Sequence, residues 1–100
     1  MRIKNAHSDD PKLECSCLSW IEHWNKNRFP NNKGSADRCF CCKKKTDELD
    51  GGHVVKIDNP DDKEYIIPLC HECNRSHSDK AFEVDENDLV KTEKSIHCRQ

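Results

Sequence analysis

Apolar positions repeat with helical spacing in one part of the chain and form short β-branched runs further along. The run SCLSWIEHWNKN covers residues 16–27. Its Trp20, Ile21 and Trp24 fall on one stripe of a helix, and Ser16 is a suitable N-cap. We therefore predict an amphipathic helix over 16–27. Both tryptophans are expected in the core, because the chain has few other large apolar side chains.

Two runs rich in β-branched and aromatic residues predict a β-hairpin. HVVKI covers residues 53–57 and EYIIPL covers 64–69, and the segment between them contains the Asn, Pro and Asp residues that favour turns. The run CHECNRSHSDKAF, over 70–82, contains neither Gly nor Pro, so we expect a helix to begin close to Cys70. The polar segment 29–37 is expected to be a loop that leads to Cys39.

The two ends of the chain show no regular pattern. The sequence DDP at 9–11 favours irregular structure, so residues 1–13 are expected to form a disordered leader. In the tail, 83–100, scattered Val and Leu residues offer short extended pieces whose packing the pattern leaves open. A chain of 100 residues has room for one core. We therefore expect residues 14–100 to form a single small domain of the α+β class.

The supply of large apolar residues is small. Leu, Ile, Val and Phe make up 18 of the 100 residues, below the roughly 20% that is typical of globular chains. The 8 cysteines can add stability through disulfides or through bound metal. Residues 1–13 contain no apolar run of the kind that a signal peptide or membrane anchor needs. We therefore expect a reducing, cytoplasmic location without membrane association, where zinc is favoured, and four disulfides are the alternative for a secreted chain.

Four of the cysteines form two chelating pairs. Cys39-x-x-Cys42 and Cys70-x-x-Cys73 lie about 30 residues apart, and a two-residue spacer lets both thiolates of a pair face one cation. Four Cys ligands close the tetrahedral shell of zinc, which predicts a structural rather than a catalytic site. A pair before a hairpin and a pair at the start of a helix is the arrangement of a treble clef. Cys41 either replaces Cys39 or Cys42 as a ligand or points away from the metal.

Further cysteines lie towards the two ends of the chain. Cys15-x-Cys17 stands at the head of the predicted helix, and Cys98 stands near the C-terminus. With His97 or His23 as the fourth ligand, these thiols would form a second zinc site that ties both ends to the domain. A disulfide between Cys98 and one of the other two thiols, or three unligated thiols, are the alternatives.

The stretches LDGGHVVKID and YIIPLCHECNRSHSDK resemble the HNH family of His-Me finger nucleases, in particular members whose ββα-metal motif is held by a zinc bound through two CxxC pairs. The resemblance covers residues 39–80. It implies that His53 is the general base that activates water and that Asn74 binds a catalytic divalent cation such as Mg²⁺ at the scissile phosphate. It therefore implies a metal-dependent endonuclease, a phosphodiesterase acting on DNA or RNA.

Two positions depart from the pattern of the HNH family. The acidic or His metal ligand that precedes the base is Gly52 here, and the family's Asn before the second CxxC pair falls near 65–66. A single ligand from Asn74 would hold Mg²⁺ weakly, so Asp50 or His77 would have to supply another. If neither does, the scaffold serves as a non-catalytic zinc-binding module for nucleic acid or for a protein partner.

Basic residues mark a candidate phosphate-binding surface. The net charge is -2, so no global positive field draws the protein to nucleic acid. Lys43, Lys44 and Lys45 follow the first CxxC pair directly, and Arg75 and Lys80 would lie nearby on the second helix. The alternative is a solvated run that the acidic side chains at 47, 48 and 50 balance.

Overall fold

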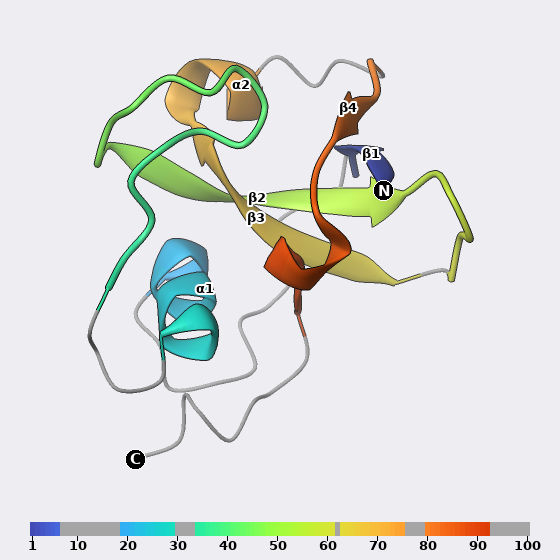
Figure 1. Ribbon diagram of the computed structural model, residues 1–100, viewed down its shortest axis with the longest axis horizontal. Coiled ribbons are helices and arrows are strands. Elements are labelled where there is room, and N and C mark those ends of the chain that lie inside the picture. The colour runs from blue at the N-terminus through green and yellow to red at the C-terminus, as the bar shows by residue number, and fades with distance from the viewer. Residues whose placement is uncertain (7–18, 30–33, 62, 76–79, 93–100) are drawn as a thin grey trace.

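The computed structural model describes residues 1–6, 19–29, 34–61, 63–75 and 80–92. In chain order its elements are β1 (Arg2–Asn5), α1 (Trp20–Arg28), β2 (Leu49–Lys56), β3 (Glu64–Cys70), α2 (His71–Arg75), β4 (Phe82–Glu83), a 3-10 turn (Glu86–Asp88) and β5 (Val90–Lys91). The strands form one antiparallel sheet in the order β4-β1-β2-β3-β5 (Figure 1). The expected α+β class is confirmed. No helix among the described residues is long and apolar enough to cross a membrane.

The predicted hairpin is confirmed and lies at the centre of the sheet. β2 begins at Leu49 rather than at His53, and its pairing with β3 runs from Leu49 opposite Cys70 to Val55 opposite Glu64. The sequence pattern missed the start of β2 because LDGG contains no β-branched residue. This register places Cys70 beside the point where the loop with the first CxxC pair enters β2.

β1 corrects the expectation of a disordered leader over residues 1–13. Arg2–Asn5 pairs with β2, where Ile3 stands opposite Lys56, and with β4 on its other side. Ile3 is completely buried and Asn5, two residues later, is also buried. This strand contributes a single apolar side chain to the core, so no alternating pattern announces it in the sequence. Residues 7–13 lie outside the described part of the chain.

α1 confirms the predicted helix but begins later than expected. Its N-cap is Ser19, whose hydroxyl oxygen accepts a hydrogen bond from the backbone N–H of Glu22 at 3.2 Å. Ser19 and Glu22 have the spacing of a capping box, a start signal that the assignment of Ser16 as N-cap overlooked. Trp24 is buried as expected, and its indole N–H donates to the Asp88 carbonyl at 2.7 Å, whereas Trp20 is only partly buried and packs against the core.

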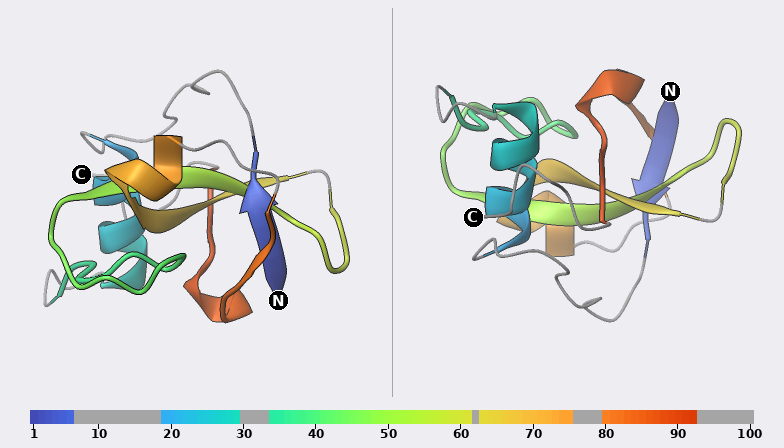
Figure 2. Two further views of the ribbon diagram at one scale, coloured as in Figure 1. Left: turned by 90° about the horizontal axis from the view of Figure 1, so that it is seen from above. Right: turned by 90° about the horizontal axis from the view of Figure 1, so that it is seen from below.

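α1 and α2 cover opposite faces of the hairpin, as the two views of Figure 2 show. Two adjacent glycines in β2 make this possible. A Cβ at Gly51 would lie 2.5 Å from the backbone of α1, and a Cβ at Gly52 would lie 2.4 Å from Cδ1 of Leu69. Successive side chains of a strand point to opposite faces. His53 therefore shares the α1 face with Gly51, and Asp50 shares the α2 face with Gly52.

The tail, whose packing the sequence pattern did not predict, supplies the strands at both edges of the sheet. β4 pairs with β1 at one edge, and β5 pairs with β3 at the other. Val84 and Val90 are buried there and join the apolar core. The fully buried apolar side chains of the hairpin are Val54, Ile66, Ile67, Pro68 and Leu69. Short edge strands of this kind leave little exposed backbone for pairing with another chain.

Candidate metal centre

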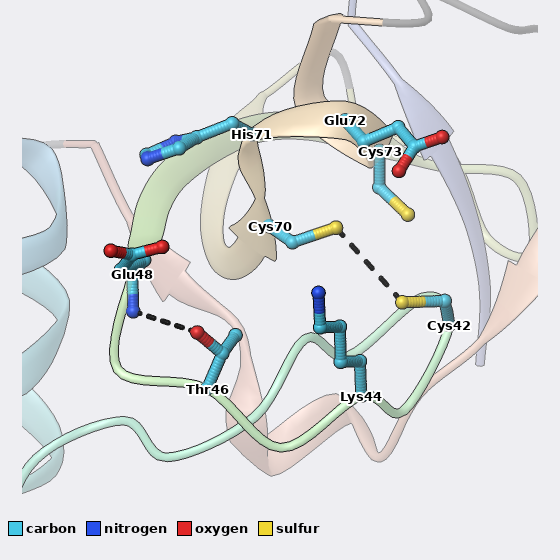
Figure 3. A pocket seen from close by; sticks show the side chains of 8 residues that line it. All are labelled: Cys42, Lys44, Thr46, Glu48, Cys70, His71, Glu72 and Cys73. Carbon is cyan, nitrogen blue, oxygen red and sulfur yellow. Dashed lines mark hydrogen bonds between the residues drawn. The ribbon is translucent and has the colours of Figure 1, made fainter.

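Four cysteines converge at one end of the hairpin. Cys39 and Cys42 lie in the loop before β2, Cys70 ends β3, and Cys73 lies in α2. Their sulfur atoms all lie within 4.8 Å of one another. The sulfurs of Cys42 and Cys70, which Figure 3 draws together with that of Cys73, are 3.9 Å apart. Within the described ranges, this is the one group of three or more His, Cys, Asp or Glu side chains placed to hold a metal ion.

Main-chain hydrogen bonds shape the loop of the first CxxC pair and attach it to the hairpin. The backbone N–H of Cys39 donates to the Lys44 carbonyl, and that of Lys43 donates to the Cys39 carbonyl, both at 2.9 Å. Lys43 adopts a φ of 68°, which turns the chain back on itself. The N–H of Phe40 donates to the Pro68 carbonyl at 3.0 Å. The backbone thus delivers the first pair of thiols to the second pair.

The environments of the four thiols differ. Cys39 is completely buried, and its sulfur accepts the backbone N–H groups of Cys41 at 3.4 Å and Cys42 at 3.5 Å. Burial opposes ionisation of Cys39, but these N–H groups and that of Cys70 lower its pKa to about 7. Burial raises the pKa of Cys73, and the neighbouring thiols raise it further. A bound divalent cation would favour the ionised form of all four thiols against the effects of burial and mutual repulsion, because thiols bind metals as thiolates.

The donor set fits zinc. Four sulfur ligands form the closed tetrahedral shell of structural zinc sites, whereas catalytic zinc sites keep one position for water. Mg²⁺ takes oxygen ligands, so this cluster offers nothing to the catalytic cation that the HNH resemblance implies. The four cysteines can therefore bind one zinc ion.

Cys41 lies outside this cluster. The four sulfurs that lie close together are those of the two CxxC pairs, and Cys41 is not among them. Cys41 is half-buried and lines a separate pocket of about 220 Å³, together with Leu69, Cys73 and Phe82. Of the two interpretations of Cys41, the structure supports the one in which its thiol points away from the metal.

The residues singled out by the HNH resemblance fall on both faces of the hairpin. On the α2 face, the side-chain amide of Asn74 donates to Asp50 Oδ2 at 3.1 Å, so these two candidate ligands meet. On the α1 face, the His53 ring packs edge-on against Trp20, with ring centroids 5.0 Å apart. The sheet therefore separates the candidate general base from the candidate ligands. His77 lies outside the described residues.

A histidine that the sequence reasoning missed joins the cluster on the α2 face. His71 Nδ1 lies 2.8 Å from Asp50 Oδ1, and the His71 side chain is half exposed. Asp50 thus contacts His71 through one carboxylate oxygen and Asn74 through the other. The long-range pairing of β2 with β3 brings Asp50 to the start of α2, because it places Asp50 opposite Leu69.

The second cysteine cluster predicted from the sequence falls almost entirely outside the described residues, which do not include Cys15, Cys17, His97 or Cys98. His23, the alternative fourth ligand, is described. It is 1% exposed, and its Nε2 lies 2.8 Å from the Lys91 carbonyl. Because a carbonyl oxygen only accepts, Nε2 is the donor in this contact, and metal binding would have to use Nδ1. The second zinc site stays a prediction.

The five basic residues of the candidate phosphate-binding surface have different surroundings. Lys43 Nζ donates to the Phe40 carbonyl at 3.0 Å, so its amino group bonds within the loop of the first CxxC pair. Lys45 is exposed, and it forms an isolated β-bridge with Arg38. Arg75 and Lys80 are exposed, and so are the acidic residues at 47, 48 and 72. Charges of both signs therefore surround the cysteine cluster, and phosphate binding stays a prediction.

A pocket of about 420 Å³ opens beside the sulfur atoms (Figure 3). Three of the cluster's cysteines line it, and the fourth, Cys39, is completely buried. The pocket is lined by Cys42, Lys44, Thr46, Glu48, Cys70, His71, Glu72 and Cys73. The cysteine cluster is thus enclosed on the Cys39 side and open to charged side chains on the other.

Comparisons of the chain with protein-family models, with curated proteins and with solved structures all return no match. The HNH resemblance therefore depends on the residues quoted for it. The four cysteines and the side chains around them are the features of the structure that point to a function.

Proposed function

We propose that this protein is a non-catalytic zinc-binding module. The observation that carries the proposal is the convergence of four cysteine sulfurs within 4.8 Å from the knuckle loop, β3 and α2. A zinc ion at this point would link the loop before β2, the end of β3 and α2. The arrangement of a CxxC knuckle, a hairpin and a second CxxC pair at a helix also supports a treble clef of HNH-like type.

The placement of His53 and Gly52 supports a non-catalytic function. Water activation and metal binding in an HNH-type reaction must act on the same phosphate, whereas His53 and Asn74 lie on opposite faces of the hairpin. Packing also excludes a ligand at position 52. A Cβ there would lie 2.4 Å from Leu69 Cδ1, and Leu69 is completely buried.

We propose a protein rather than a nucleic acid as the partner of this module. Binding to a phosphate backbone needs concentrated positive charge. Around the cysteine cluster the exposed basic residues alternate with exposed carboxylates, and the chain carries a net charge of -2. A mixed surface of this kind suits the polar rim of a protein interface. An electrophoretic shift of nucleic acid that weakens with salt would contradict this choice of partner.

The zinc proposal is tested by comparing a chelator with a thiol reductant. The buried Trp24 supplies a fluorescence signal for unfolding. We expect a strong zinc chelator to unfold the protein, added zinc to refold it, and reductant alone to leave it folded. Unfolding by reductant, together with resistance to chelator, would establish disulfides in place of zinc.

The contacts of Asp50 with His71 and Asn74 favour one second candidate, an HNH-type endonuclease. These three polar side chains gather on the α2 face beside the cysteine cluster. Incubation of the protein with plasmid DNA or RNA and Mg²⁺, Mn²⁺ or Ni²⁺ tests this candidate. Cleavage that Asp50→Ala abolishes and His53→Ala spares would place the reaction on the α2 face, and cleavage lost with His53→Ala would support His53 as the base. The absence of cleavage with every metal would remove the candidate.

A further inference from the structure

The three consecutive lysines after the first CxxC pair are adjacent in sequence but meet different surroundings. The Lys43 amino group is directed at the Phe40 carbonyl, and Lys45 faces solvent. Lys44 alone of the three lines the pocket beside the cysteine cluster, and Figure 3 shows its amino group directed toward the sulfurs of Cys42 and Cys70. Lys44 makes no side-chain ion pair with any described residue.

The backbone of Lys44 holds this side chain at the cluster. Its carbonyl accepts the N–H of Cys39 at 2.9 Å, and the next N–H back along the chain, that of Lys43, donates to the Cys39 carbonyl, also at 2.9 Å. These two bonds close the loop of the first CxxC pair at Lys43 and Lys44. The position of its Cα relative to the sulfurs is therefore fixed by the same turn that positions Cys39 and Cys42.

The charge around the cluster calls for a cation at this place. Four thiolates and one Zn²⁺ carry a net charge of -2. Glu48 and Glu72 line the same pocket, and neither carboxylate makes an ion pair with the described residues. Lys44, Glu48 and Glu72 are exposed, and negative charges that line one pocket at a protein surface still repel one another more strongly than they would in bulk water. Lys44 is the only lysine or arginine among the described residues that line this pocket.

We infer that Lys44 offsets the negative charge of the four-thiolate zinc centre and is not a contact for nucleic-acid phosphate. The inference rests on the proposed zinc function and extends it to the side chains around the metal. It separates Lys44 from Lys45, which the sequence alone treats as equivalent. It also assigns opposite effects to Lys44 and Glu48, which both line the pocket.

The test measures zinc affinity by competition with a chromophoric chelator at low ionic strength. We expect Lys44→Met to weaken zinc binding about 10-fold, at the low end of the effect of groups that surround metal ligands. The matched control Lys45→Met should leave the affinity unchanged, and Lys44→Arg should retain most of it. Glu48→Gln should strengthen binding, because it removes a negative charge from the same pocket.

Salt dependence separates a charge effect from a packing effect. High salt screens charges in an open pocket, so the difference between the native protein and Lys44→Met should shrink at about 1 M salt. Equal affinities for Lys44→Met and Lys45→Met would overturn the inference, and so would a loss that salt does not change. Failure of the native protein to bind zinc at all would instead overturn the proposed function.

Discussion

The two faces of the β2–β3 hairpin differ in what they do with the polar side chains of β2. On the α1 face, His53 packs against Trp20 and is part of a closely packed layer under the helix. On the α2 face, Asp50 contacts His71 and Asn74 beside the four cysteines. Residues three positions apart in one strand thus belong to an aromatic packing contact on one side and to a polar cluster beside the cysteines on the other. Two residues that lie close together in one strand can therefore differ in whether they belong to the site.

Replacement of the buried cysteine of the cluster should have the largest effect on the α2 face. Cys39→Ser removes the sulfur that lies deepest and accepts two backbone N–H groups. Zinc binding in small zinc-dependent domains contributes about 10–16 kcal/mol, more than the net stability of most domains of this size. We expect Cys39→Ser to be largely unfolded by circular dichroism, whereas Cys41→Ser remains folded. Equal folding of the two variants would contradict the assignment.

A side chain added at Gly52 should disturb the same face by overpacking. The Cβ of Gly52→Ala would lie 2.4 Å from Cδ1 of the fully buried Leu69. Overpacking of this kind costs about 1–3 kcal/mol, and we expect a value near the upper end. Chemical denaturation of the zinc-loaded protein measures the loss. A variant as stable as the native protein would show that Leu69 can move aside.

Substitutions of His53 and Asn74 should have effects of different kinds. His53→Ala removes an aromatic contact on the α1 face, so we expect a loss of about 1 kcal/mol in the free energy of unfolding and no change in zinc affinity. Asn74→Ala removes the hydrogen bond to Asp50 next to Cys73, so we expect faster zinc release. Chemical denaturation measures the loss of stability, and release rates measured with excess chelator compare the zinc binding of the two variants. Faster release from His53→Ala alone would reverse the assignment of the two faces.

The smallest expected effect lies at the far end of the hairpin. The backbone N–H and the guanidinium of Arg2 lower the pKa of Asp58. A carboxyl with a lowered pKa stabilises the folded state above its unfolded pKa, and this stabilisation is lost as the pH falls through the folded pKa. We therefore expect Asp58→Asn to be slightly less stable than the native protein at pH 7 and equal to it at an acidic pH well below the lowered pKa of Asp58. Denaturation at both pH values tests this, and a difference that persists in acid would assign the effect to packing.

The local parts of the site could be predicted from sequence. The spacing of each CxxC pair brings its two thiols to one side of a turn, and the β-branched runs announce the hairpin that joins the pairs. These features depend on neighbours within a few residues. The four-cysteine cluster could therefore be predicted from the sequence alone.

The parts that depend on long-range packing could not be predicted. Ile3 alone cannot reveal β1, because a single apolar residue has no period. The register of the hairpin decides that Asp50 meets His71, and the docking of α1 over Gly51 decides that His53 is covered. No pattern within one segment of the sequence encodes these pairings.

The zinc content of single cysteine variants tests the central claim most directly. Native mass spectrometry of the purified protein, of Cys41→Ser and of Cys73→Ser counts the zinc ions on each chain. We predict at least one zinc on the native chain, the same number on Cys41→Ser, and at least one fewer on Cys73→Ser. The absence of zinc from the native chain, or equal zinc on the two variants, would contradict the four-cysteine centre.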